Sequence, residues 1–409
     1  YRKYIGDGRR CYCKMFFIDN HFLRCYNIFD NGGFMNIAID IDDTLTESFS
    51  YFIPFVAEYF HISKEELQKD NISYNTFPDE WKKEELQFCK KYYDKVVPDT
   101  PFKKDARYYV NKLHEEGHKI VIITARTKDM YTDPYKTTKE ELDKNHLLYD
   151  EIVCVMDKAQ ACQERKIDLF IDDSIHNLEA VFKSGIRVML FTSRGNRDAV
   201  TPFERVSSWS SIYERIQGLV KGYPNKSEAL KLLDEAEQSN SGAWYRHSKT
   251  VAFCAEKIAA ACGMNTEKAY VFGLLHDIGR KFGIKHLGHI YDGYAYMNRL
   301  GYTKVAQICL THSFPTKNMK IYLGKFDIEE KEQKELQVAL SACKYDDYDR
   351  LIQLCDALGG SERVLDIEER MADVKERYGA YPQEQWDKNL WLKKYFEEKA
   401  GKNIYSICS

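Results

Sequence analysis

No stretch of this 409-residue sequence is apolar for long enough to cross a bilayer, which takes about 20 residues. Net charge is also nearly absent, because 60 lysines and arginines are balanced by 63 aspartates and glutamates, which leaves −3. A strongly basic surface is the usual footprint of proteins that bind nucleic acids or anionic membranes. We therefore expect neither a nucleic-acid polymer nor a membrane among the partners of this chain.

The twelve cysteines include no CxxC pair, and the sequence has no internal repeat and no low-complexity tract. One short cluster, Cys11, Cys13 and Cys25, has the wrong spacing for a metal site. Several other cysteines fall within apolar helical patterns: Cys254, Cys262, Cys309 and Cys355. Buried thiols of this kind are typical of a reducing compartment, so we expect a cytoplasmic protein.

Residues 1–34 lack the helical or strand period of the rest of the chain, and the sequence opens on Tyr1 rather than on methionine. They also lack the basic and apolar segments of a signal peptide. Patterned sequence starts at Met35, and residues 31–34 can be encoded by codons that resemble a bacterial ribosome-binding site. We expect residues 1–34 to be a non-native or disordered leader. Native protein with residues upstream of Met35 would contradict this hypothesis.

From residue 35 to about residue 220, short apolar runs alternate with amphipathic helical segments such as 103–116 and 177–183. The predicted strands are 36–41, 119–124, 152–155, 169–171 and 188–191. They are rich in Ile and Val with little polar alternation, as in strands that are covered on both faces. The pattern predicts a Rossmann-like α/β domain with a parallel sheet and right-handed crossovers.

An insert at about 49–99 separates the first two predicted strands, reads as helical, and would form a small cap over the strand ends. It is rich in aromatic residues: Phe49, Tyr51, Phe52, Phe55, Tyr59, Phe60, Phe77, Trp81, Tyr92 and Tyr93. We expect about two-thirds of these rings to form the core of the cap, and one or two to face the cleft and stack on a base.

A length of 409 residues predicts two or three domains, and Gly222-Tyr223-Pro224 indicates a break between two of them. No convincing strand follows Ser227. The segment 247–261 has apolar residues at helical spacing, with Gly263 as a stop, and the segment 270–278 continues the helical pattern. We predict an all-α domain at residues 223–409, after the α/β domain at 35–220.

The first chemical motif follows the apolar run 37–39 and reads Asp40-Ile41-Asp42-Asp43-Thr44. Further polar residues end or follow the later strands: Thr124, Lys158, Asp172 and Asp173. Because ligands bind beyond the carboxyl ends of parallel strands, we expect these side chains to converge. A carboxylate can attack phosphorus to form an aspartyl-phosphate, and the charge repulsion calls for a cation such as Mg²⁺. Solvated turns would explain any one acidic residue, but not the whole ordered set.

This set resembles the haloacid-dehalogenase-like phosphohydrolases over about residues 35–218. The sequences IDIDDTLTES, TAR and IDDS resemble the 5′(3′)-deoxyribonucleotidase branch, although sugar-phosphate phosphatases of that family also carry small caps. The resemblance implies that Asp40 is the nucleophile and that Asp42 protonates the leaving oxygen and then activates water. It further implies that Thr124, Arg126 and Lys158 bind the substrate.

The same resemblance implies a Mg²⁺ site in the α/β domain. Its expected ligands are Asp40, the main-chain carbonyl of Asp42, Asp173 and Asp172. The last motif has Asn177 where the family has an aspartate, which leaves open how Asp172 and Asp173 divide their roles. Lys166 is a weaker alternative to Lys158 for the lysine role.

The second chemical motif consists of His247, the adjacent pair His276-Asp277, and Asp356, spread over helical sequence. Imidazole and carboxylate ligands suit Mn, Fe, Co, Ni or Zn. Since neighbours on a helix differ by about 100°, His276 and Asp277 can share a metal only at the inner edge of a bundle.

These residues resemble the HD-domain metal-dependent phosphohydrolases over about residues 225–409. His289 and His312 match the extra histidines of two-metal members, among them the YqeK-like dinucleoside tetraphosphate hydrolases. The resemblance implies one or two transition metals that activate a water. Arg280 and Lys281 would bind substrate phosphate, with Arg246 as a weaker alternative. We leave out His286, because a lone histidine is usually structural.

The sequence as a whole predicts a bifunctional phosphohydrolase of nucleotide metabolism, compatible with a homo-oligomer. The first domain would be a Mg²⁺-dependent 5′-nucleotidase, and the second a metal-dependent nucleotide phosphohydrolase. One alternative is a sugar-phosphate phosphatase whose second domain binds a nucleotide and regulates the first. Either way, the partners would be small-molecule phosphate esters.

Overall fold

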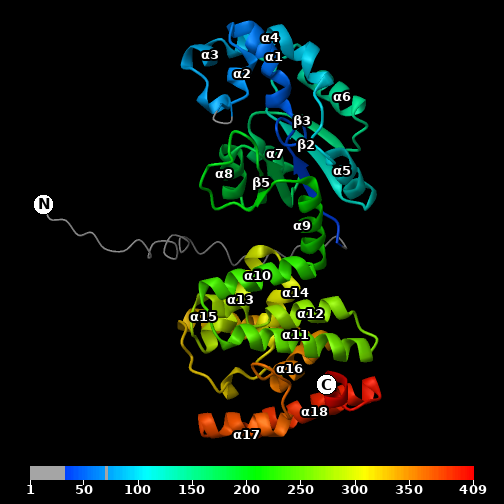
Figure 1. Ribbon diagram of the computed structural model, residues 1–409, viewed down its shortest axis with the longest axis vertical. Helices are drawn as coiled ribbons and strands as arrows, with labels where there is room; N and C mark the ends of the chain where they lie inside the picture. Colours follow the sequence, from blue (N-terminus) through cyan, green and yellow to red (C-terminus); the bar gives the residue numbers. More distant parts are fainter. Residues whose placement is uncertain (1–32, 70–71) are drawn as a thin grey trace, which may run out of the picture.

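The computed structural model describes residues 33–69 and 72–409, and it divides visibly into a sheet region and a helical region (Figure 1). The sheet region contains six parallel strands in the order β3-β2-β1-β4-β5-β6. Their bounds are β1 Asn36–Ile39, β2 Lys119–Thr124, β3 Glu151–Cys154, β4 Leu169–Asp172, β5 Arg187–Phe191 and β6 Arg205–Val206. The five predicted strands are therefore confirmed, and the two-residue β6 is the one that was missed.

Helices cover both faces of the sheet. Successive strand residues point to opposite sides, so each strand contributes to two cores. On β1, Ile37 and Ile39 enter one core and Ala38 enters the other. The first core is shared with α5 (Ala106–Glu115), α6 (Pro134–Lys144) and α9 (Trp209–Lys221). The second is shared with α7 (Lys158–Glu164) and α8 (Ile175–Lys183). Apolar residues on both faces are the signal that predicted a covered parallel sheet.

A helical cap follows β1, as predicted, and lies at the end of the molecule farthest from the helical region (Figure 1). It contains α1 (Ser48–Phe60), α2 (Lys64–Leu67), η1 (Tyr74–Thr76), α3 (Asp79–Lys83), α4 (Glu85–Val96) and η2 (Val97–Asp99). Its two chain connections meet where the Glu47 N–H donates to the Pro101 carbonyl at 2.9 Å. The cap has a small core of its own, built around Phe88 and Tyr92.

The second region is all-α over its described residues, apart from one isolated bridge between Gly359 and Val364. Its longer helices are α10 (Lys226–Ser239), α11 (Ala243–Ala261), α12 (Thr266–Leu275), α13 (Leu287–Leu300), α14 (Thr303–Thr311), α15 (Glu330–Ala342), α16 (Asp347–Leu358), α17 (Ile367–Tyr378) and α18 (Gln383–Ala400). The shorter pieces are η3 (Ile278–Phe282), η4 (Met319–Ile321) and α19 (Ile404–Cys408). The predicted fold class of this region is confirmed.

Helix α12 corrects one detail of the prediction, which continued the helix to residue 278. It ends at Leu275, and Asp277 already has non-helical angles, with φ −102° and ψ 14°. The following Gly279 explains the change, because a Cβ there would lie 1.9 Å from the His289 carbonyl oxygen. The chain therefore turns tightly against α13 at this point.

Helix α9 leads from the sheet region toward the helical region (Figure 1). It ends at Gly222, whose φ of +77° provides the left-handed cap, and whose carbonyl accepts from the Lys304 N–H at 2.9 Å. A domain boundary near residues 220–223 remains our prediction, and the predicted leader lies mostly outside the described residues. In the described part of the chain, each helix is too short or too polar to cross a membrane.

Candidate functional site

The carboxyl ends of the strands bring together a buried lysine and two aspartates. Asp40 follows β1, Asp172 ends β4, and Lys158 begins α7 just after β3. The Lys158 ammonium donates to Asp40 Oδ1 at 2.5 Å and to Asp172 Oδ2 at 2.8 Å. These residues are distant in sequence, and they converge because the carboxyl ends of parallel strands lie at the same edge of the sheet.

Asp173 completes a group of three carboxylates, with Asp40 and Asp172, whose oxygens lie within 4.8 Å of one another. Burial and the nearby Asp172 carboxylate raise the pKa of Asp40 to about 7, although Lys158 opposes the shift. Burial and the same neighbour raise the pKa of Asp173 well above its usual range. A cluster of crowded oxygen donors with one ammonium fits a divalent cation that prefers oxygen ligands.

Asp172 and Asp173 have different surroundings, which bears on the unusual Asn177. The Asn177 amide donates to Asp172 Oδ2 at 3.0 Å, and the Ser174 N–H donates to Asp172 Oδ1 at 2.7 Å. With Lys158, Asp172 therefore accepts three hydrogen bonds from protein groups. Asp173 makes fewer such contacts, which leaves its oxygens better placed to hold a cation.

Thr124 lies at the end of β2, where its buried hydroxyl has no hydrogen-bond partner. An unpaired buried hydroxyl is costly unless a ligand completes it, so this position suits a phosphoryl oxygen. Lys166 lies elsewhere: its carbonyl accepts from the Asn36 amide at 3.0 Å, at the opposite end of β1. The structure thus brings Lys158 to the cluster and does not bring Lys166.

Asp42 lies beside this cluster with its side chain 45% exposed, and it is held by a buried arginine. Arg126 donates through Nη2 to Asp42 Oδ1 at 2.9 Å and through Nε to Asp42 Oδ2 at 3.2 Å. Its Nη1 donates to Glu141 at 2.5 Å. The guanidinium predicted to bind substrate is therefore engaged by two carboxylates of the protein.

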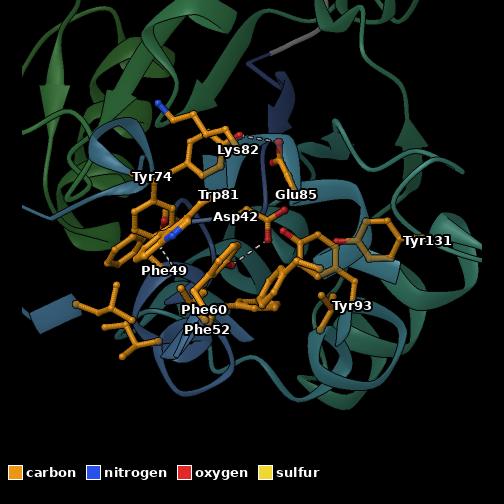
Figure 2. A pocket seen from close by; sticks show the side chains of 18 residues that line it. Asp42, Phe49, Phe52, Phe60, Tyr74, Trp81, Lys82, Glu85, Tyr93 and Tyr131 are labelled. Atoms are coloured by element: carbon orange, nitrogen blue, oxygen red, sulfur yellow. Dashed lines mark hydrogen bonds between the residues drawn. The ribbon is translucent and has the colours of Figure 1, made fainter. Parts of the chain in front are cut away.

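A cavity of about 330 Å³ opens between the cap and Asp42 (Figure 2). Six of the ten cap aromatics named from the sequence line it: Phe49, Phe52, Phe60, Phe77, Trp81 and Tyr93. Polar groups are few, and Glu85 and Tyr74 among them form a 2.8 Å hydrogen bond. All ten of these rings belong to the cap core or pack against it, so stacking of one or two of them on a base stays a prediction.

The helical region contains a second site, made from residues on or next to five helices. His247 lies on α11, His276 and Asp277 follow α12, and Asp356 lies on α16. His247 Nε2 is 3.0 Å from Asp356 Oδ1, and His276 Nε2 is 3.7 Å from the same oxygen. His247, His276 and Asp277 form one group whose ligand atoms lie within 4.8 Å of one another.

Asp277 also belongs to a second group, with His289 on α13 and His312 just after α14. Its Oδ1 is 3.1 Å from His289 Nε2 and 3.5 Å from His312 Nε2. Despite burial, Arg280 and the histidines hold the pKa of Asp277 well below its usual range. One carboxylate shared by two ligand groups is an arrangement that fits a pair of metal ions.

Backbone carbonyls orient three of these histidines. Nδ1 of His276 lies 2.7 Å from the Gly273 carbonyl, Nδ1 of His312 lies 2.8 Å from the Cys309 carbonyl, and Nδ1 of His289 contacts the His286 carbonyl. Each Nδ1–H can donate there, which leaves the Nε2 lone pair free to bind a metal. The buried Nε2 of His276 has no other partner. The donor set therefore fits a transition metal.

The predicted phosphate-binding cations of this region have different positions. Arg280 donates to Asp277 Oδ2 at 2.5 Å and so lies at the site. Lys281 donates to the Tyr296 hydroxyl at 3.2 Å, and Arg246 is 3.8 Å from Glu362 on the surface. The side chain of His286 belongs to neither ligand group, as expected.

Sequence reasoning missed Glu141, the buried partner of Arg126. It is wholly buried on α6, one turn after the buried Thr137 and Thr138. A helical face that carries a glutamate among buried residues is a signal that can be found in the sequence. It implies a buried cation, although only the fold identifies that cation as Arg126.

Two family models match the chain, and together they span both sites. Residues 34–221 match the family described as 5′ nucleotidase, deoxy (Pyrimidine), cytosolic type C protein. Residues 244–359, from α11 to just past α16, match the HD domain. No curated protein sequence matches the chain.

Solved structures similar to the sheet region include a haloacid dehalogenase-like family hydrolase from Streptococcus pneumoniae. It is 14% identical, with a TM-score of 0.33, and the match covers 44% of this chain and 97% of that one. Another is a haloacid-dehalogenase-superfamily hydrolase from Ehrlichia chaffeensis, 14% identical with a TM-score of 0.32, covering 45% and 97% of the two chains. The family matches confirm the sequence-based assignment: a nucleotidase-type haloacid-dehalogenase-like domain precedes an HD domain in a bifunctional phosphohydrolase of small-molecule phosphate esters.

Proposed function

We propose that the first domain is a Mg²⁺-dependent 5′-nucleotidase that acts through a phospho-aspartate on Asp40. The observation that carries this proposal is the position of the aromatic cavity, whose wall includes Asp42, next to the Asp40–Lys158–Asp172 cluster. A nucleoside 5′-monophosphate has both parts that this arrangement can bind, a flat base and a phosphate. Small sugar phosphates have no group that matches the rings.

In the first chemical step, Asp40 Oδ attacks phosphorus while the bond from phosphorus to the ribose oxygen breaks. Burial raises the pKa of Asp42, but Arg126 outweighs it and lowers the pKa, so Asp42 takes up a proton from solvent before this step. It then gives that proton to the ribose oxygen, so that the nucleoside leaves as an alcohol. In the second step Asp42 takes a proton from water, whose oxygen attacks phosphorus and releases phosphate and free Asp40. Mg²⁺ held by Asp40, Asp173 and the Asp42 carbonyl would neutralise the phosphoryl charge.

Lys158 and Thr124 would bind the phosphoryl oxygens during both steps. Burial lowers the pKa of Lys158, but Asp172 and Asp40 outweigh it and raise the pKa above its usual value, so the side chain stays cationic. The partnerless Thr124 hydroxyl gains an acceptor when the phosphoryl group arrives. Both groups are already in place, which limits the reorganisation that binding requires.

We propose that the HD domain hydrolyses a second nucleotide phosphoester or phosphoanhydride. The shared Asp277 and the oriented histidines support two transition metals, which would activate water and polarise the phosphate. Arg280 lies beside Asp277 and would bind substrate phosphate. The nine described cysteines are free thiols, which supports the predicted cytoplasmic location.

Trapping the covalent intermediate tests the first proposal. The full chain with Mg²⁺ and a ³²P-labelled nucleoside 5′-monophosphate should give an acid-stable, hydroxylamine-sensitive label. Asp40→Asn should abolish the label, while His286→Ala, in the other domain and outside its ligand groups, should keep it. Label that persists in Asp40→Asn would contradict the mechanism. Equal rates for ribose 5-phosphate and nucleotides would favour the sugar-phosphate alternative instead.

A further inference from the structure

Arg126 makes an unusually complete set of contacts for a side chain next to a catalytic cleft. Its side chain is 3% exposed, and three of its nitrogens donate to protein oxygens. Besides Asp42 and Glu141, it contacts the Thr138 hydroxyl at 3.3 Å. A substrate phosphate would have to displace these partners in order to bind the guanidinium.

Asp42 has the opposite character, because its side chain is half-exposed and faces the cleft cavity. Both carboxylate oxygens accept from the planar guanidinium fork, and Oδ1 also accepts from the Ser48 hydroxyl at 2.9 Å. A bidentate fork fixes the plane of a carboxylate, which a single point charge does not. The exposed aspartate is thereby oriented by a buried residue.

Glu141 supplies the fixed end of this arrangement. It is wholly buried on α6, and its Oε2 accepts from Arg126 Nη1 at 2.5 Å. Helix α6 packs against the sheet through Leu142, so the position of Glu141 is set by the core. The chain of contacts therefore runs from the core through Glu141 and Arg126 to Asp42.

We propose that Arg126, anchored by Glu141, is a positioning residue that aims the Asp42 carboxyl at the leaving oxygen. This inference rests on the proposed function, in which Asp42 transfers that proton. It replaces the predicted contact of Arg126 with substrate. A positioned proton donor matters most for a leaving group that departs poorly as an anion, and least for one that departs readily.

Leaving-group dependence of kcat/KM tests the proposal, because kcat/KM reports the first chemical step. Arg126→Lys, which keeps the charge and loses the fork, should lower kcat/KM for a nucleoside 5′-monophosphate by about 10- to 100-fold, part of the ~10²–10⁴ that such catalysis contributes. For p-nitrophenyl phosphate, whose nitrophenolate leaves without a proton, the loss should stay below about 3-fold. The rate measured with Asp40→Asn is subtracted from each rate, so that only Asp40-dependent hydrolysis is compared.

Two further variants keep the test independent of folding defects. Glu141→Gln retains Arg126 and should cause a smaller loss with the same dependence on the leaving group. In an Asp42→Asn background, Arg126→Lys should cause little additional loss, because the two act through one interaction. Lys139→Ala, on the exposed face of α6, is the matched control and should leave kcat/KM unchanged for both substrates.

The outcomes separate this inference from the proposed function. Equal losses of kcat/KM on both substrates, or a rise in KM with kcat unchanged, would overturn the positioning role. Neither result would contradict the nucleotidase activity. A lack of Asp40-dependent hydrolysis in the unaltered protein would overturn the nucleotidase and the positioning role together.

Discussion

The two sites of this chain hold their catalytic groups by different means. In the sheet region, strand ends collect carboxylates from distant positions, and burial together with the neighbouring carboxylates raises the pKa of Asp40 to about 7. In the helical region, four helices contribute imidazoles, and backbone carbonyls orient three of them. The first site thus presents hard oxygen donors and the second mostly nitrogen donors, so they should select different metals.

Removing the metals and restoring them one at a time should have the largest effect of the changes that distinguish the two activities. After chelation, both should fall more than about 100-fold, because each needs a metal to stabilise charge. Mg²⁺ should restore only the Asp40-dependent activity, and Mn²⁺ or another transition metal should restore the Asp277-dependent one. The measurement is phosphate release with each ion added alone. Restoration of both activities by Mg²⁺ alone would contradict the contrast between the sites.

A histidine variant should sharpen the account of the helical site. His289→Ala should remove about one metal ion per chain and lower the HD-domain activity by about 10- to 100-fold, because only one of the two groups loses a ligand. Elemental analysis of the purified protein checks the metal content. His286→Ala is the control, and it should keep both ions. An unchanged metal content in His289→Ala would argue against the second metal position.

The cap cavity distinguishes the sheet site from the helical site by its aromatic walls. Trp81→Ala should raise KM for nucleoside monophosphates by about 10-fold, because stacking on a base is worth ~1–3 kcal/mol. KM for ribose 5-phosphate and the HD-domain activity should not change. Steady-state kinetics give both values. Tyr108→Ala, an exposed ring on α5, serves as the control.

Arg215 joins the two regions physically, and its loss should separate them. It donates to Glu204 Oε1 at 2.6 Å and to the Leu300 carbonyl, and it lies 4.5 Å from the centre of the Tyr302 ring. Arg215→Met should cost about 1–3 kcal/mol, because the hydrogen bonds of a buried guanidinium to Glu204 and to the Leu300 carbonyl are lost. Calorimetry should then resolve two unfolding transitions, where we expect a single transition in the unaltered protein. A single transition in the variant would show that other contacts join the regions.

His118 should give the smallest effect, confined to the sheet region. Its Nδ1 accepts the Met35 N–H at 3.0 Å, and burial lowers its pKa below the usual value. The unfolded chain therefore binds more protons, so this stability is present above pH ~6.5 and is lost as the pH falls below it. Urea unfolding at pH 7 and pH 5 checks this. The free energy of unfolding should decline less between the two pH values in His118→Gln than in the unaltered protein. His61→Gln is the exposed control.

Much of this comparison could be predicted from the sequence because each region has a strong local signal. Ile- and Val-rich runs identify β1 to β5, and the order of Asp40, Thr124, Lys158 and Asp172 on their ends predicts one converged cluster. The helical ligands follow the same logic, and His289 and His312 do lie with Asp277.

Other features depend on tertiary contacts that no local pattern encodes. The end of α12 at Leu275 follows from the close approach of Gly279 to α13. The pairing of Arg126 with Glu141 depends on how α6 docks on the sheet. Arg126 lies two residues after the threonine that we predict to bind phosphate, so the sequence favours a substrate contact as readily as a contact within the protein. Only the burial of its side chain beside Glu141 reveals the partner that it has.

The central claim, two independent phosphohydrolase sites in one chain, is tested most directly by crossing two variants with two substrate classes. Phosphate release is measured for the unaltered protein, Asp40→Asn and Asp277→Ala, with nucleoside monophosphates and with nucleotides that contain a phosphoanhydride. We predict that monophosphate hydrolysis is lost only in Asp40→Asn, and that a second activity is lost only in Asp277→Ala. If Asp277→Ala changes only how nucleotides modulate the Asp40-dependent activity, the HD domain is a regulator and the claim of two active sites is wrong.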